Sequence, residues 1–552
     1  MRFLISFLFV LLLWNCKKTT SKELSIQDDS DLAAISSKDF REFKVVDSKY
    51  INVSELWIPF EKDLKSFTEE LYINLKPLVL EQDIPTLQSY IKKGDLSYEL
   101  LTKFYLYRIR KYDRENELSL NSVISLNPNV IVQARELDNM DDLDVDKRHP
   151  IFGMPILLKD NINVSHIPTT AGAVALKNNI AADAFVVKKL KGKGALILGK
   201  ANLSEWAYFF CGDCPSGYSA IGGQTLNPYG RRIMDTGGSS SGSGVAVASN
   251  FCAAAIGSET SGSILSPSSQ NSIVGLKPTV GLVSRSGIIP ISSTLDTSGP
   301  MTRNVLDNAI LLDAMIGYDI KDFKSLNEKL NILGSAKHNN NNNNNNNLSL
   351  KGKRFGAFRK LLEDSLYVDA ISDLKLRGAI IVEIDEEHIE LPDFVRLLNL
   401  DMKTDLPMYL SNYAGTDLTV NSVEDVIGFN EKDSLNSMPY GQKLFLGIVA
   451  DNATEAEFDT IKMILKKNGR AFFDKPLEAY NLDGFLSINN YHAGFAAVAE
   501  YPAITVPMGY TSEGVPEGLT FISKPLSEEK LLSWAYIYEQ TSKKRKPPVN
   551  YN

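Results

Sequence analysis

The chain has 552 residues, of which 43% are hydrophobic and 23% are charged, and its formal net charge is −8. This balance is typical of a globular protein with enough apolar material for a large core, and it excludes a low-complexity chain. The only basic cluster, at residues 543–546, is interpreted as a solvated tail, so we do not expect the protein to bind nucleic acid.

The N-terminus differs in composition from the rest of the chain. Arg2 precedes an apolar run over residues 3–13, and Cys16 follows shortly after it. About a dozen apolar residues are typical of a secretory signal peptide and too few for a confident membrane-spanning helix. Cys16 resembles the lipid-attachment site of bacterial lipoproteins, although Trp14 and Asn15 stand where that family prefers small residues.

We therefore expect residues 1–16 to be a signal peptide and Cys16 to be lipid-modified. The protein would then be exported to the cell envelope, in the periplasm or at the outer membrane, and held at a membrane through its lipid alone. An ordinary cleaved signal peptide and a short uncleaved anchor are the alternatives. Residues 17–54 begin polar and rich in serine and are predicted to form a flexible tether, with the folded domain at residues 55–552.

Elements of both kinds are predicted along the folded domain. Helical patterning begins near Glu55 and is clearest over residues 97–112. Between residues 150 and 305, apolar runs at 152–158, 195–198 and 253–257 predict buried strands, and residues 186–193 predict a helix. Strands are also predicted at 485–487 and 503–507, with a closing helix at 527–540. Strands that alternate with helices indicate an α/β sheet.

Asparagine fills residues 339–347, directly after His338, and a polar run of this kind predicts an exposed loop at 338–347. Cys211 and Cys214 form a C-x-x-C pair without a second pair, so a zinc site is not expected. A disulfide and two free thiols both remain open for them, whereas Cys252 lies in an apolar stretch and is expected in the core.

Several common catalytic motifs are missing from the sequence. The five histidines form no H-E-x-x-H pattern, no serine stands in a G-x-S-x-G elbow, and no Walker loop is present. These observations give no support to a zinc hydrolase, a Ser-His-Asp hydrolase or a nucleotide-binding enzyme. We expect neither a metal nor an organic cofactor.

Three other segments carry the chemistry. Lys159 ends the apolar run of the segment at residues 153–161. Ser239 lies in a glycine-serine run at 237–244, which passes directly into small apolar residues suited to a packed helix rather than into a linker. Ser263 follows the predicted strand at 253–257, at a position where backbone N–H groups could stabilise an oxyanion.

Together these segments resemble the amidase signature family. Its glycine-serine signature matches residues 237–244 and 257–268, and its lysine motif matches 153–161. Further matches lie at residues 275–279, 281–284, 296–303, 502–507 and 516–519, and the resemblance spans about residues 80–548. Residues 222–225 are similar to those of stand-alone bacterial amidases, including peptide amidases. The resemblance implies one large α/β/α domain with a mixed, mostly parallel central sheet flanked by helices.

The resemblance also implies a role for each matching residue. Ser263 aligns with the nucleophile, Ser239 with a bridging serine after a cis peptide bond to Gly238, and Lys159 with the general base. The oxyanion hole is assigned to the backbone N–H groups of Thr260, Ser261, Gly262 and Ser263. Glu259, Ser261 and Leu265 depart from the residues most frequent in the family, but none of the three reacting residues is replaced.

The general-base role has a physical requirement. A lysine has an ordinary pKa of about 10.4, so it accepts a proton at neutral pH only where burial disfavours its charge. The position of Lys159 at the end of an apolar run is compatible with such burial.

The sequence therefore predicts a hydrolase of carboxamide or peptide-type amide bonds, acting through an acyl-enzyme on a small-molecule or peptide amide. An esterase using the same site, a catalytically inactive ligand-binding lipoprotein and the amidase subunit of a tRNA amidotransferase are the alternatives. Residues 208–218 and 400–445 are candidate walls of the substrate pocket, because loops set specificity on a shared scaffold. Phe209, Phe210 and Tyr218 could line it or pack in the core.

Overall fold

The computed structural model describes residues 43–114, 116–140, 147–334 and 348–552. Its strands are β1 Val123–Leu126, β2 Pro155–Lys159, β3 Leu196–Ala201, β4 Tyr218–Ser219, β5 Gly223–Gln224, β6 Ala254–Glu259, β7 Val274–Lys277, β8 Thr297–Thr302, β9 Arg354–Phe358, β10 Ile380–Ile384, β11 Gly484–Ile488, β12 Ala503–Tyr510 and β13 Pro516–Ile522. Eleven of them form one sheet in the order β1-β3-β2-β6-β8-β7-β12-β13-β11-β9-β10, and β4 and β5 pair separately.

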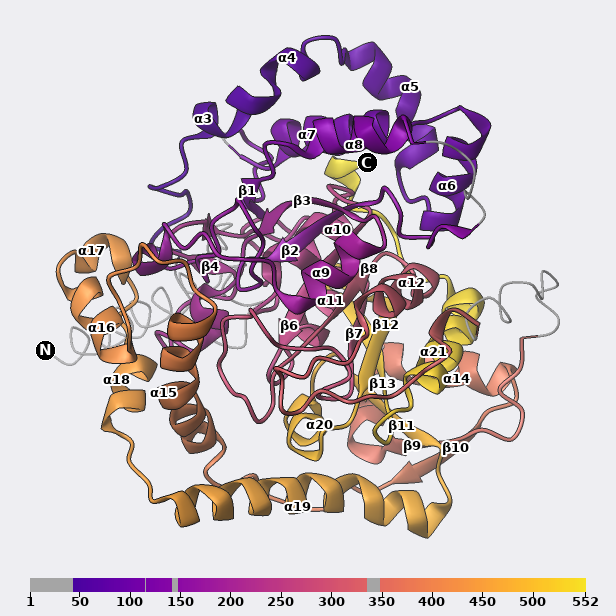
Figure 1. The fold of residues 1–552 in the computed structure, drawn as a ribbon. Helices are drawn as coiled ribbons and strands as arrows, with labels where there is room; N and C mark the ends of the chain where they lie inside the picture. Colours follow the sequence, from indigo (N-terminus) through magenta and orange to yellow (C-terminus); the bar gives the residue numbers. More distant parts are fainter. Residues whose placement is uncertain (1–42, 115, 141–146, 335–347) are drawn as a thin grey trace, which may run out of the picture.

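Helices flank this sheet (Figure 1). They are α3 Val53–Trp57, α4 Glu61–Leu64, α5 Glu69–Val79, α6 Ile84–Lys93, α7 Tyr98–Tyr112, α8 Val130–Asp138, α9 Phe185–Gly192, α10 Ser241–Ala248, α11 Leu265–Gln270, α12 Val305–Met315, α14 Ser365–Leu376, α15 Phe394–Asn412, α16 Val423–Glu431, α17 Ser434–Ser437, α18 Lys443–Ala450, α19 Glu455–Tyr480, α20 Ala493–Ala499 and α21 Glu528–Ser542. Helix α12 packs against α9 and α21, whereas α10 and α11 contact each other. Helices α15–α18 gather on one side of the molecule (Figure 1).

The single α/β domain with a mixed sheet is confirmed, but the expectation that the sheet is mostly parallel is wrong. Six of the ten neighbouring pairs in the large sheet are antiparallel. One reason lies in the connections, since β12 and β13 are joined by a short turn, and a short turn permits only antiparallel pairing. The parallel pairs β3-β2-β6 lie where the predicted catalytic segments begin.

The predicted elements around these strands are present. Strands β2, β3 and β6 are fully buried along their length, which explains their continuous apolar sequence. The helix predicted over residues 97–112 is α7, and the Ser97 side chain caps it by accepting a hydrogen bond from the backbone N–H of Leu100 at 3.1 Å. The closing helix and the two late strands are α21, β11 and β12.

The boundary between tether and domain requires a correction, because residues 43–54 pack on the folded domain. The Val46 carbonyl accepts a hydrogen bond from the backbone N–H of Gln224 at 2.8 Å. The Ser48 hydroxyl donates to the carbonyl of Ile221 at 2.5 Å, and Val53 already begins α3. The tether is predicted from the polar composition of this segment, and composition does not reveal such hydrogen bonds.

Residues 1–42 and 335–347 lie outside the described residues, and so do the expected signal peptide, Cys16 and the asparagine run. Among the residues that are described, no helix is both long and apolar enough to cross a bilayer. Cys211 and Cys214 form a disulfide, the first of the two possibilities left open above. Cys252 is buried in the core, as expected.

A buried ion pair lies next to the predicted general base. Lys200 in β3 lies 3.2 Å from the carboxylate of Asp160, and both side chains are fully buried. Replacing Lys200 by Met would leave the Asp160 charge without its cation, so we expect the free energy of unfolding, measured by urea titration, to fall by about 3–5 kcal/mol. The control Lys353→Met removes a half-exposed pair with Asp483 and should cost at most about 1 kcal/mol. Equal losses for the two variants would contradict this prediction.

Candidate active site

Lys159 is the last residue of β2 and is fully buried. Its Nζ atom lies 2.8 Å from Ser239 Oγ, 2.9 Å from Ser258 Oγ and 3.0 Å from the Ser258 carbonyl oxygen. Burial lowers the pKa of Lys159 to about 7, because it disfavours the charged ammonium; the charges of Asp296 and Glu259 act in the opposite direction. A substantial fraction of Lys159 is therefore neutral near pH 7 and able to accept a proton.

Ser239 is also fully buried, and the peptide bond between Gly238 and Ser239 is cis, as the family resemblance implies. Its carbonyl oxygen accepts a hydrogen bond from the backbone N–H of Ser204 at 3.0 Å. Gly237 has a φ of +63°, and a Cβ atom there would lie 2.7 Å from the backbone nitrogen of Pro267. The glycine-serine run is thus a packed segment that places Ser239 between Lys159 and the loop of Ser263.

Ser263 lies in the loop between β6 and α11 and is 9% exposed, so it is more open to solvent than Lys159 or Ser239. Its carbonyl oxygen accepts a hydrogen bond from the backbone N–H of Ser240 at 3.1 Å, which joins the two serine segments. The carboxylate of Glu259 accepts hydrogen bonds from the backbone N–H groups of Ile264 at 2.7 Å and Leu265 at 3.0 Å. Glu259 therefore fixes the start of α11 and with it the position of Ser263.

The predicted oxyanion donors are the four consecutive residues of this loop, 260–263. Within the described residues, their backbone N–H groups donate to no backbone carbonyl and no side chain. Four donors held in one short loop, next to an accessible serine, form an arrangement that can bind a developing negative charge.

Comparison with known proteins places this arrangement in a family. The family model described as Amidase matches residues 101–440. A probable amidase of Arabidopsis thaliana is 37% identical over 485 residues, which cover 85% of this chain and 92% of that relative. The chain belongs to the amidase signature family. This amidase is therefore an amide-hydrolysing enzyme, as its sequence predicts.

Two solved structures resemble this amidase closely. An amidase family protein from Bacillus anthracis strain Ames has 38% sequence identity and a TM-score of 0.84, covering 91% of this chain and 99% of its own. The peptide amidase from Stenotrophomonas maltophilia has 37% identity and a TM-score of 0.77, covering 85% of this chain and 98% of its own. The shared fold therefore extends well beyond the signature segments.

Gly262 controls the shape of the loop that carries Ser263. It has a φ of +86°, and a Cβ atom there would lie 2.8 Å from the amide nitrogen of the Asn490 side chain. In the variant Gly262→Ala we expect kcat to fall by about 10²- to 10³-fold, the effect of losing one well-placed oxyanion donor. The measurement is steady-state amide hydrolysis.

The control for this prediction is Gly352→Ala. Gly352 has a φ of +82°, but nothing lies within 4 Å of the position of its Cβ atom. The control should share the dihedral cost of roughly 1–2 kcal/mol in stability and leave kcat unchanged. A Gly262→Ala enzyme with normal kcat would show that the loop tolerates displacement.

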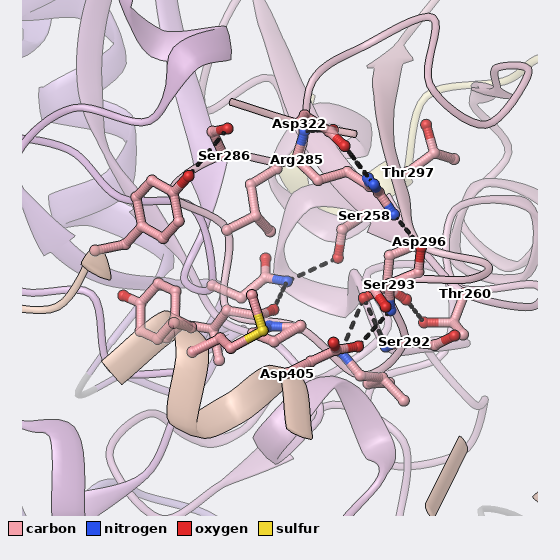
Figure 2. Close-up of a pocket in the computed structure, with 18 of the residues that line it drawn as sticks. Ser258, Thr260, Arg285, Ser286, Ser292, Ser293, Asp296, Thr297, Asp322 and Asp405 are labelled. Atoms are coloured by element: carbon pink, nitrogen blue, oxygen red, sulfur yellow. Dashed lines mark hydrogen bonds and ion pairs between the residues drawn. The ribbon is translucent and has the colours of Figure 1, made fainter. Parts of the chain in front are cut away.

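A cavity of about 280 Å³ lies beside the Ser263 loop of this amidase (Figure 2). Asn161, Ser258 and Thr260 form the wall nearest the catalytic residues. Polar side chains, among them Arg285, Asp322 and Asp405, lie around the rest of it (Figure 2). Most of the remaining lining is apolar and comes from Ala207, Ile288, Ile289, Pro290, Ile291, Phe323, Met408, Tyr409 and Tyr413.

Of the two segments predicted to form pocket walls, only one lines the cavity. The stretch at residues 400–445 contributes Asp405, Met408, Tyr409 and Tyr413 through helix α15 and the residue that follows it. The segment at 208–218 does not line this cavity; Phe209, Phe210 and Tyr218 are buried in an apolar cluster with helices α15, α16 and α18. These three side chains therefore pack in the core, which is one of the two possibilities given for them above.

Three residues of the site were not singled out in the sequence. Ser258 contacts Lys159 Nζ through both its hydroxyl and its carbonyl, and its hydroxyl accepts a hydrogen bond from the Asn161 amide at 2.9 Å. Asp296 accepts a hydrogen bond from the Thr260 hydroxyl and so supports the oxyanion loop. All three stand inside segments that match the family, but their roles depend on contacts between β2, β6 and β8.

Proposed function

We propose that this amidase cleaves carboxamide or peptide-type amide bonds through an acyl-enzyme on Ser263, with Ser239 and Lys159 moving the proton. One observation carries the proposal: the fully buried Lys159 amine lies 2.8 Å from the hydroxyl of Ser239. A lysine with a pKa of about 7 is poised to act as a base at neutral pH.

The proposed first half-reaction transfers protons along one line. Neutral Lys159 accepts the proton of the Ser239 hydroxyl, and Ser239 accepts that of Ser263. The Ser263 Oγ atom then bonds to the carbonyl carbon of the substrate, and the carbonyl electrons move to its oxygen. The backbone N–H groups of residues 260–263 hold this oxyanion, and each well-placed donor is worth about 3 kcal/mol in such sites.

Loss of the amine completes the first half-reaction, and hydrolysis of the acyl-enzyme in the second restores the enzyme. The proton returns from Lys159 through Ser239 to the leaving nitrogen, the carbon–nitrogen bond breaks, and ammonia or an amine departs. In the second half-reaction water attacks the ester carbonyl carbon on Ser263, the water proton passes through Ser239 to Lys159, and a proton returns to the Ser263 oxygen as the ester bond breaks. The products are a carboxylic acid and the free serine, so no metal ion or redox cofactor is needed for the balance of the reaction.

The class of amide follows from what the chain resembles. Peptide amidase, to which the chain is 37% identical across most of both proteins, supports C-terminally amidated peptides as one substrate class. The cavity beside the Ser263 loop, with its largely apolar lining, is compatible with a hydrophobic group next to the scissile amide. We therefore propose simple carboxamides and amidated peptides as the first substrates to examine.

The test is hydrolysis of a panel by the purified full-length protein. The panel contains aromatic and aliphatic carboxamides, C-terminally amidated dipeptides and the methyl esters of the same acids. Release of ammonia from the amides supports the proposal. Turnover restricted to the esters would instead identify an esterase, and a folded protein that turns over nothing in the panel would overturn the proposed substrate class.

A further inference from the structure

The cavity beside the Ser263 loop, which Thr260 lines, contains a carboxylate that is used neither by the proposed catalytic steps nor by an ion pair among the described residues. Asp405 in α15 lines it, and its carboxylate accepts a hydrogen bond from the backbone N–H of Ser293 at 2.6 Å. Within the described part of the chain, no lysine, arginine or histidine lies within ion-pair distance of Asp405. Its position is thus fixed by the backbone, while its negative charge stays without a cation.

The other charged groups around Asp405 are already engaged or exposed. Arg285 forms an ion pair with Asp322 and also donates to the carbonyl of Ser293 (Figure 2). Arg285 therefore neutralises the charge of Asp322, and its guanidinium is already bound to the Asp322 carboxylate and the Ser293 carbonyl. Lys321 also lines the cavity, but its side chain is exposed to solvent, which screens its charge.

Two further carboxylates lie in the same region, and their oxygens are more fully occupied by hydrogen-bond donors than those of Asp405. Asp296 accepts backbone N–H groups of Ile291 and Ser292 and the Thr260 hydroxyl. Asp401 accepts the Ser292 hydroxyl and is buried. The cavity wall is therefore acidic, and Asp405, which accepts one backbone hydrogen bond, is the carboxylate with an oxygen left to bind a ligand.

The apolar part of the cavity continues to its rim. Phe323 and Met408 both line it and are 77% and 60% exposed, respectively, which is unusual for large apolar side chains. Ile289 and Ile291 line it as well, and both are buried. A ligand that fills this space meets hydrocarbon on several sides and one carboxylate.

We propose that Asp405 is a specificity-determining residue that binds a positively charged amino group of the substrate, beside a hydrophobic or aromatic group held by the apolar walls. The preferred substrates would be amides that carry an ammonium group, and amides with a carboxylate in its place would be disfavoured. This inference rests on the proposed function, because it assigns the cavity to the substrate of Ser263. An ammonium replaces the missing cation of Asp405, and such a charged hydrogen bond contributes about tenfold or more to affinity.

The test uses three para-substituted benzamides: 4-(aminomethyl)benzamide, 4-methylbenzamide and 4-carboxybenzamide. They carry a positive charge, no charge and a negative charge, respectively. We expect the kcat/KM of the wild-type enzyme at pH 8 to be at least about tenfold higher for the aminomethyl compound than for the methyl compound. This pH keeps Asp405 ionised, because burial, reinforced by the charge of Asp401, raises the pKa of Asp405 to about 7.

Asp405→Asn should remove this preference, so that the ratio of the kcat/KM values for the aminomethyl and methyl compounds falls from at least about tenfold to within about twofold of 1. The matched control is Asp417→Asn, which removes the same charge from an exposed residue outside the cavity and should change neither value. If Asp405→Asn fails to fold, Met408→Lys at the exposed rim should lower the preference for the ammonium compound instead. An unchanged preference in Asp405→Asn, or a preference for the carboxylate, would overturn the inference.

Binding measurements separate this inference from the proposed function. Calorimetry with the same compounds and Ser263→Ala, with and without Asp405→Asn, measures their affinity for the cavity in the absence of turnover. Ammonium-selective binding that depends on Asp405, in an enzyme that hydrolyses no amide, would retain the inference about the cavity and reject the proposed reaction. Hydrolysis of all three compounds with equal binding would reject the inference alone.

Discussion

Ser263→Ala is expected to lower the kcat for amide hydrolysis by about 10⁴- to 10⁶-fold, the range seen when a serine nucleophile is removed from a preorganised site. The variant keeps the oxyanion loop, because Glu259 and Gly262 hold the loop through its backbone. It loses only the oxygen that bonds to the substrate. The measurement is ammonia release from a neutral carboxamide under saturating conditions.

A neighbouring serine supplies the control. Ser266 is three residues farther along, in helix α11, and is half-buried. Ser266→Ala should change kcat by less than about threefold, because no role in the chemistry is assigned to it. Mass spectrometry after incubation with a slowly hydrolysed ester should detect an acyl group on the wild type and none on Ser263→Ala. Labelling of another residue, or activity that survives in Ser263→Ala, would reject Ser263 as the nucleophile.

Lys159→Arg is expected to be almost as damaging, with a fall in kcat of about 10⁴-fold. Arginine keeps the positive charge and the ability to donate hydrogen bonds, but its guanidinium does not release a proton in proteins and so cannot act as a base. A purely structural role for Lys159 would instead be partly rescued by arginine. Lys277→Met is the control, because Lys277 is a buried lysine of the same sheet, bound to the Tyr501 carbonyl at 2.7 Å.

The pH dependence tests the same residue in the wild-type enzyme. Burial lowers the pKa of Lys159 to about 7, and only the neutral amine accepts a proton. The kcat/KM for 4-methylbenzamide should therefore rise with pH through about 7 and fall about tenfold for each pH unit below it. The neutral substrate minimises the contribution of Asp405. A profile that stays flat between pH 5.5 and 8.5 would contradict the base role of Lys159, and Lys277→Met should leave the midpoint in place.

Much of the fold around the site can be predicted from short-range sequence patterns. Strands β2, β3 and β6 are buried on both faces, so their sequences are continuous apolar runs that stand out from their surroundings. The serine-capped helix α7 and the closing helix α21 likewise have local patterns. The proposed catalytic residues lie in or close to these strands, and their motifs resemble one family in the same order.

Other features have no local pattern. The antiparallel share of the sheet depends on which strands become neighbours across long connections, and apolar runs carry no information on pairing. The attachment of residues 43–54 depends on backbone hydrogen bonds to β5 and to nearby loops, which polar side chains do not reveal. The cavity combines residues from 285–297, 321–323 and 405–413 with Asn161, Ala207, Ser258 and Thr260, which are distant in sequence and come together only in the folded chain.

The sequence by itself determined the family and the order of its signature segments, and it predicts Lys159, Ser239 and Ser263 as the catalytic residues, because each stands in a short motif. The tertiary structure alone decided that Lys159 is buried against Ser239 and Ser258, and hence that its pKa falls to about 7. It also decided that Asp405 meets the cavity without a cation. Burial and charge pairing depend on neighbours from different strands and helices, so only the folded chain settles them.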